Sequence, residues 1–323
     1  MSADATPLLA PWLHALASLE KGQNVSLVMV VEHSGSVPGV TGTHVVVSES
    51  GIVGTVGGGA AEQALVEQAR THRGEPELVH FRHTPGEGGT LCSGLQIFAI
   101  ILLSQNDQST VQNIVDTLSE HRTGSIQVSS SGLSFTPGNT APHSFVEEGD
   151  SWTYSGPVGL EDTLYIIGGG HVSLALSRVM SALPFKIIVL DDRESLPTMA
   201  ANRWAHEVRV VDMERLADHV GEGRRSWAVI MTFGHEHDRE ALASLLGKEL
   251  AYLGLMGSQA KVRHLLAQLR AADAPVELLQ RVHAPVGLPI GSHTPEEIAI
   301  SIAAEIIAAK NGIEDPCPRS SSN

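Results

Sequence analysis

The chain has 323 residues, more than one hydrophobic core usually supports, so two domains are expected. Its formal net charge is −15 and its pI is about 5.4, which argues against nucleic acid as a partner because an acidic surface repels phosphate backbones. An anionic small molecule is not excluded, because glycine turns at helix N-termini supply local positive potential.

Hydropathy and cysteine content indicate a cytoplasmic protein that does not enter a membrane. The sequence contains no run of about 18 apolar residues that could span a bilayer. Residues 1–11 lack the basic segment of a secretory signal. The two cysteines, Cys92 and Cys317, cannot form a disulfide framework.

Apolar spacing predicts an N-terminal α/β domain over residues 1–122. Helices are expected near 8–21, 60–72 and 109–121. Strands are expected at 26–31, 44–48, 52–56, 78–81 and 95–103. Residues 123–160 are rich in Ser, Gly and Pro, and we interpret them as an irregular β extension and linker.

Residues 161–311 show a regular alternation of strands and helices, which predicts a Rossmann-like, doubly wound parallel sheet. The strands are expected near 164–167, 187–191, 208–211, 227–232 and 252–255. Thr294 and Glu297 form a capping-box pattern that starts a final helix. Residues 312–323 are expected to be a disordered tail.

The turn Gly168-Gly169-Gly170-His171 follows the first of these strands and suggests a nucleotide site. Gly168 would make the turn, and Gly170 would let backbone approach a phosphate at the helix N-terminus. Asp191 ends the next strand, where an acid accepts hydrogen bonds from ribose hydroxyls. Ser173 replaces the third glycine of the motif, so a Rossmann-like sheet that no longer binds dinucleotide is the alternative.

A second strand–glycine–helix junction comprises Gly57, Gly58, Gly59 and Glu62, and it is a further candidate for anion binding. The alternative interpretation is a tight turn without a ligand. Cys92 lies in a glycine-rich loop, where an accessible thiol could coordinate a soft metal or exchange sulfur. The alternative is a small buried apolar side chain.

His235, His237 and Asp238 follow the strand that ends near 231, at an edge where α/β sheets place ligand groups. They could bind a metal or handle protons, although the H-x-H-D spacing is not diagnostic of zinc. The alternative is a polar helix N-terminus capped by Asp238.

The sequence contains neither a G-x-S-x-G nucleophile elbow nor a P-loop.

In combination, these blocks resemble the XdhC/CoxI family, accessory proteins that mature molybdenum hydroxylases such as xanthine dehydrogenase. The resemblance extends from about residue 26 to 310. The blocks that carry it are Gly35–Pro38, Thr41–Thr43, Gly54–Glu62, Leu91–Gly94, Ile167–Val172, Leu190–Arg193, Tyr252–Ser258, Pro285–Gly291 and Thr294–Ala299.

The resemblance implies a non-catalytic chaperone with an XdhC/CoxI domain and a Rossmann domain. Its cargo would be the molybdenum cofactor (molybdopterin), which it would help to sulfurate and insert into an apo molybdenum hydroxylase. A cysteine desulfurase and a second copy of the chain are the other implied partners, and Cys92 is the implied contact to the metal. The expected cofactor-binding residues are Gly57, Gly58, Gly59, Glu62, Cys92, Gly168, Gly169, Gly170, His171, Asp191, His235 and His237.

The chain departs from the family pattern at positions where many relatives carry cations. Gly39 stands in place of an arginine, and Gln259-Ala260 stands in place of two. Ser93 replaces a glycine after Cys92. Because guanidinium groups bind phosphate bidentately, their absence weakens the case for an ordinary pocket that binds an anionic cofactor. An NAD(P)-dependent oxidoreductase using Asp191, or a nucleotide-binding module, remains the alternative function.

Overall fold

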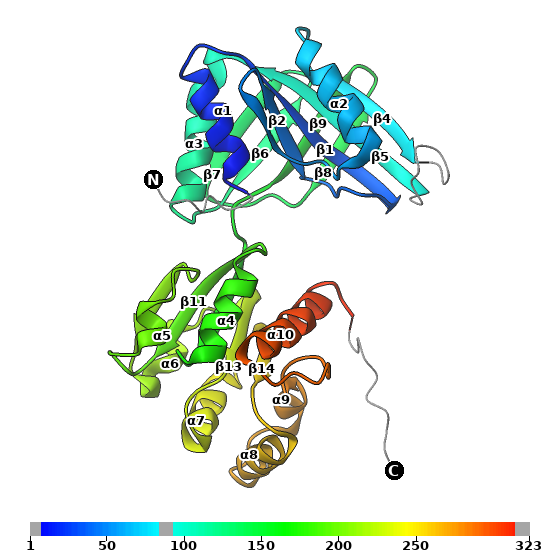
Figure 1. The fold of residues 1–323 in the computed structure, drawn as a ribbon. Helices are drawn as coiled ribbons and strands as arrows, with labels where there is room; N and C mark the ends of the chain where they lie inside the picture. The colour runs from blue at the N-terminus through cyan, green and yellow to red at the C-terminus, as the bar shows by residue number, and fades with distance from the viewer. Residues whose placement is uncertain (1–7, 84–92, 314–323) are drawn as a thin grey trace. The chain divides into compact units, whose positions relative to one another are not determined.

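The computed structural model describes residues 8–83 and 93–313, and the chain divides into two compact units, residues 1–160 and 161–323. Each unit has its own apolar cores and is described separately (Figure 1). Cys92, expected to contact the cofactor, and most of the tail expected to be disordered lie outside the described residues.

Among the described residues of the N-terminal unit, five strands form an antiparallel sheet in the order β3-β2-β1-β5-β4. Side chains of β1 alternate between two cores, with Leu27 and Met29 in one and Val28 and Val30 in the other. Burial on both faces explains why this strand is a continuous apolar run. The strands are β1 (Val25–Ser36), β2 (His44–Ser48), β3 (Gly51–Gly54), β4 (Glu77–His83) and β5 (Ser93–Leu103).

Helices cover both faces of this sheet (Figure 1). α1 (Ala10–Leu19) and α3 (Gln108–Ser119) contribute Trp12 and Ile114 to one core. α2 (Gly59–Thr71) packs Leu65 against the other face. A short 3₁₀ turn at Gln105–Asp107 precedes α3.

The segment expected to be an irregular extension and linker is instead a regular antiparallel sheet in the order β7-β6-β9-β8. In β9, buried and partly exposed side chains alternate, and Trp152 and Tyr154 join the core formed by α1 and α3. Because these strands share that core, they belong to the compact N-terminal unit. They are β6 (Gly124–Ser129), β7 (Gly132–Pro137), β8 (Ser144–Glu148) and β9 (Ser151–Val158).

Within residues 161–313, six strands form a parallel sheet in the order β12-β11-β10-β13-β14-β15. Renumbered along the chain, this order is 3-2-1-4-5-6, the doubly wound arrangement predicted from the alternation. The order reverses between β10 and β13. The strands are β10 (Asp162–Ile167), β11 (Phe185–Asp191), β12 (Glu207–Val210), β13 (Gly223–Ile230), β14 (Leu250–Leu255) and β15 (Val282–His283).

Helices also lie on both faces of the parallel sheet (Figure 1). α4 (His171–Met180) and α10 (Pro295–Lys310) share one core with the sheet. The capping box predicted for α10 is confirmed, since Thr294 Oγ1 accepts the Glu297 N–H and the Glu297 carboxylate accepts the Thr294 N–H. The helices that contribute to the other core are α6 (Leu216–His219), α7 (His235–Leu245), α8 (Gln259–Ala271) and α9 (Val276–Gln280).

Two short elements complete the C-terminal unit: α5 (Pro197–Ala200) and a 3₁₀ turn at Met213–Arg215. Across residues 8–83 and 93–313, no helix is both long and apolar enough to cross a membrane.

We predict that Trp152→Ala destabilises the N-terminal unit by about 3–5 kcal/mol, because Trp152 is only 5% exposed and its removal leaves a cavity in the shared core. Val146→Ala in neighbouring β8 is the control, since Val146 is 54% exposed and should change stability by less than about 0.5 kcal/mol. Urea unfolding of both variants measures the difference. Equal, small effects would mean that the second sheet is not part of the core.

Candidate functional site

A small crevice lies at the carboxyl edge of the parallel sheet, beside the point where the strand order reverses. Its volume is about 70 Å³. It brings together three residues singled out in the sequence, Gly168, Asp191 and His237. The complete lining is Gly168, Asp191, Asp192, Arg193, Met213, Thr232, Phe233 and His237. Open α/β sheets bind ligands at this position.

The glycines of the turn after β10 have different roles. Gly168 has a φ of 111°, and a Cβ there would collide with the carbonyl of Met231, which follows β13. Gly170 has a φ of −73°, and a Cβ there would meet no described atom within 4 Å. Gly168 is therefore required by the fold, whereas Gly170 leaves open space at the N-terminus of α4.

The Asp191 carboxylate accepts four hydrogen bonds in the crevice, and the residue is only 3% exposed. Its Oδ2 accepts the Gly169 N–H at 2.6 Å and Arg193 Nη2 at 2.7 Å. Its Oδ1 accepts the main-chain N–H of Arg193 at 3.0 Å and Nε at 2.8 Å. Burial alone would raise the pKa of Asp191, but these hydrogen bonds outweigh it and lower the pKa. The same pairing raises the pKa of Arg193.

An aromatic side chain forms the rim of the crevice. Phe233 is 78% exposed, and the Arg193 guanidinium lies 5.8 Å from its ring centroid. This geometry is a cation–π contact, which helps to hold Arg193 in place.

The residues after Phe233 separate into buried and exposed groups. Gly234, not Asp238, is the N-cap of α7, which corrects the capping interpretation. Asp238 is fully buried, accepts hydrogen bonds from the Thr232 N–H and Oγ1, and pairs with Lys261. It therefore ties the loop to α8 and is not presented to a ligand.

The three candidate histidines do not converge. His235 and His237 are exposed in the first turn of α7, and only His237 lines the crevice. His171 lines a separate groove of about 410 Å³, formed by α4, α10 and Trp204. Among the described residues, no group of three or more His, Cys, Asp or Glu side chains is placed to share a metal ion.

In the N-terminal unit, the Gly57–Gly59 junction binds a carboxylate of its own chain. Glu62 Oε2 accepts hydrogen bonds from Thr55 Oγ1 at 2.6 Å, the Val56 N–H at 2.8 Å and the Gly58 N–H at 3.0 Å. Burial would raise the pKa of Glu62, but these hydrogen bonds outweigh it and lower the pKa. Of the amides expected to bind an external anion, that of Gly58 is thus used by Glu62, and that of Gly57 donates to Thr55 Oγ1 at 3.0 Å.

A buried network of hydrogen bonds that the sequence pattern did not predict lies close to this junction. Gln96 is completely buried; its Nε2 donates to the Gly39 carbonyl at 2.7 Å, and its Oε1 lies 2.5 Å from His83 Nε2. Gly39 in turn packs against Val56 and Gly57. A single polar residue inside the apolar run 95–103 was the available signal.

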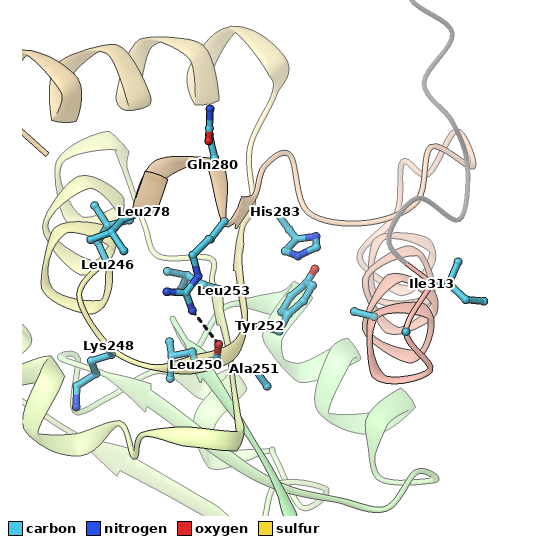
Figure 2. A pocket seen from close by; sticks show the side chains of 13 residues that line it. Leu246, Lys248, Leu250, Ala251, Tyr252, Leu253, Leu278, Gln280, His283 and Ile313 are labelled. Carbon is cyan, nitrogen blue, oxygen red and sulfur yellow. Dashed lines mark hydrogen bonds between the residues drawn. The ribbon is translucent and has the colours of Figure 1, made fainter. Parts of the chain in front are cut away.

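A larger cavity, of about 590 Å³, lies near the amino-terminal end of β14 and contains none of the residues predicted from the sequence (Figure 2). Arg281 donates to the Leu250 carbonyl at 3.3 Å. His283 stacks on Tyr252 at 4.3 Å and hydrogen-bonds Glu305 at 3.0 Å. Arg281 and Lys248 follow the last turns of α9 and α7, where cations complement helix dipoles, so we assign them a structural role.

The parallel sheet, its glycine turn and the acid that ends the second strand define a Rossmann-type domain. Family models agree with this class: "XdhC and CoxI family" matches residues 18–82, and "XdhC Rossmann domain" matches residues 164–306. One match falls in each unit. The chain belongs to the XdhC/CoxI family.

Individual relatives agree with this assignment. The chain is 29% identical over 310 residues to the uncharacterized protein YqeB of Escherichia coli strain K12, covering 91% of this chain and 45% of that protein. It is 28% identical over 150 residues to a Bacillus subtilis strain 168 protein named as a probable subunit of xanthine dehydrogenase, covering 46% and 43%. The matched region therefore covers less than half the length of either relative.

A crystal structure described as a xanthine dehydrogenase from Bacillus halodurans has the same fold. Its TM-score is 0.74, with 23% identity over 97% of this chain and 98% of that chain. At this identity, the similarity supports the fold alone.

We predict that Gly168→Ala destabilises the C-terminal unit by about 2 kcal/mol or more, because of its positive φ and the collision with the Met231 carbonyl. Gly170→Ala, two residues away, is the matched control and should change stability by less than about 1 kcal/mol. Chemical denaturation of the two variants compares them. Equal losses would contradict the different roles of the two glycines.

A second prediction concerns Glu62, whose pKa is lowered in the folded state. Because the folded-state pKa of Glu62 is lowered, its ionised carboxylate stabilises the folded protein at pH values above the ordinary pKa of 4.5. That stabilisation is lost as the pH falls through the folded-state pKa. Glu62→Gln should therefore be less stable than the parent at pH 7, and the difference should shrink below pH 4.5. Unfolding measured from pH 7 to pH 3 tests this, and a pH-independent difference would contradict it.

Proposed function

We propose that the protein binds the molybdenum cofactor as cargo, supports its sulfuration and inserts it into a molybdenum hydroxylase of the xanthine dehydrogenase type. The observation that carries the proposal is the family match in both units. The B. subtilis relative supports it, since that protein is named as a probable part of xanthine dehydrogenase. A carrier of this kind works in the cytoplasm with the apo-hydroxylase, a cysteine desulfurase and a second copy of the chain.

The carboxyl-edge crevice supports cofactor handling. Molybdopterin is a fused ring system with a phosphate and a dithiolene that holds the metal. Open space beside Gly170 at the start of α4 suits the phosphate, because helix N-termini favour anions. The exposed ring of Phe233 offers a face for stacking. His237, at the same edge, is a further polar contact.

Cys92 is the proposed contact to the metal or its sulfur ligand, because a thiolate is a soft ligand. The preceding described strand ends at His83, and the following one begins at Ser93. Ser93 pairs with Ser36, and the adjacent Gly94 packs against Val37. The start of β5 therefore lies beside residues 36–39, the segment that contacts Gly57.

The alternative function is an NAD(P)-dependent oxidoreductase. The observation in its favour is Asp191 at the end of β11, the position of the ribose-binding acid. The four hydrogen bonds that Asp191 accepts from Gly169 and Arg193 count against it.

The test is to purify the protein from a host grown with molybdate, and to measure released pterin fluorescence, molybdenum and NAD(P) in the same sample. Pterin together with molybdenum is the expected result. Cys92→Ala should lower the retained molybdenum about tenfold or more, as ligand-shell changes do, while Cys317→Ala should not. NAD(P) without pterin would contradict the carrier function. An unchanged amount of retained molybdenum in Cys92→Ala would contradict only the proposed contact of the Cys92 thiol, not the carrier function.

A further inference from the structure

We propose that Arg193 is a specificity-determining residue that excludes dinucleotides from the carboxyl-edge crevice by closing its ribose subsite. The inference rests on the proposed function in one respect, since a carrier benefits when its site rejects abundant nucleotides. Its geometry and its test concern only this crevice.

The first step is the state of the ribose-binding acid. To hold a ribose, the acid at the end of the second strand must present free oxygen lone pairs to the hydroxyl groups. The Arg193 guanidinium instead binds Asp191 as a fork, with Nε on Oδ1 at 2.8 Å and Nη2 on Oδ2 at 2.7 Å. Two parallel charge-assisted bonds of this kind are among the strongest side-chain pairings in proteins.

The second step is the support of the fork. On one side, Arg193 contacts the ring of Phe233 at 5.8 Å. On another, its Nε lies 3.9 Å from Asp192 Oδ1. Asp191 itself accepts the Gly169 N–H at 2.6 Å. The guanidinium is therefore fixed over the carboxylate by contacts on several sides.

The third step is space. With the Arg193 side chain in place, the crevice measures about 70 Å³. Arg193 lines this crevice together with Gly168 and Asp191. Truncation of its side chain would enlarge the space directly over the carboxylate.

The fourth step is what remains after truncation. Arg193→Ala keeps the main-chain N–H that donates to Asp191 Oδ1, and the Gly169 N–H still donates to Oδ2. Asp191 therefore keeps two main-chain hydrogen bonds, and the lone pairs released by the fork are open to ribose hydroxyls. The sequence supplies two further parts of a dinucleotide site, Gly168 at the turn and Gly170 at the start of α4.

Calorimetric titration with NADH and with ADP-ribose tests the proposal. The parent protein should bind either ligand weakly, and Arg193→Ala should bind at least tenfold more tightly. Arg209→Ala is the control, because Arg209 also pairs with a carboxylate two residues before it: its Nε and Nη2 both donate to Glu207 Oε2 on β12. This control should leave nucleotide affinity unchanged.

Two further variants keep the test decisive. Asp191→Ala combined with Arg193→Ala should lose the gain, which shows that the gain depends on the acid. Arg193→Lys keeps the charge but cannot form the fork, so it should give an intermediate affinity. It also provides a test if Arg193→Ala does not fold, which thermal unfolding will reveal.

Tight NADH binding by the parent, no gain in a folded Arg193→Ala or Arg193→Lys protein, or a gain that persists without Asp191 would each overturn the proposal. These outcomes are independent of the cofactor measurement. A protein purified without pterin, whose Arg193→Ala variant nevertheless gains NADH affinity, would refute the proposed function and leave the role of Arg193 intact.

Discussion

The Asp191 carboxylate is the interaction on which the architecture of the candidate site depends. It ties the end of β11 to the turn after β10 through the Gly169 N–H, and it orients Arg193 at the same time. A carboxylate this buried needs several donors to stay charged, because burial without them is costly. The Gly169 N–H and Arg193 supply those donors, and Arg193, held in this way, lines the crevice and contacts the ring of Phe233.

The doubly wound half of the fold could be predicted because its signal is local. Strands β10, β11 and β14 are largely continuous apolar runs, as expected for a parallel sheet covered on both faces, and helix-period segments lie between the strands. Gly168 and Asp191 could be placed for the same reason, since both end strands. The fork between Arg193 and Asp191 could not, because it depends on side-chain conformation and not on spacing. The spacing of His171 likewise gave no indication that it lines the groove of α4 and α10.

The strands of the first N-terminal sheet could be predicted, but the sheet of β6 to β9 and the contacts of Gln96 could not, because they join residues distant in sequence. β6 pairs with β9, although β7 and β8 lie between them in the sequence. The alternation of apolar and polar residues in these strands is obscured by Ser, Gly and Pro. Gln96 joins Gly39 to His83 only once β5 lies beside β1. The same packing explains a departure from the family pattern: a Cβ at Gly39 would collide with the Val56 carbonyl, so a larger residue cannot be placed on this backbone.

The Gly57–Gly59 junction carries its own competitor for anions. The Glu62 side chain is tethered to the helix whose first turn it serves, so its effective concentration at these amides is that of an intramolecular ligand, roughly millimolar or higher. A free phosphate or carboxylate must exceed that concentration, or bind much more tightly, before it displaces Glu62. The loop before α2 is thus held in shape without an external anion, and anions at lower concentrations leave it unchanged.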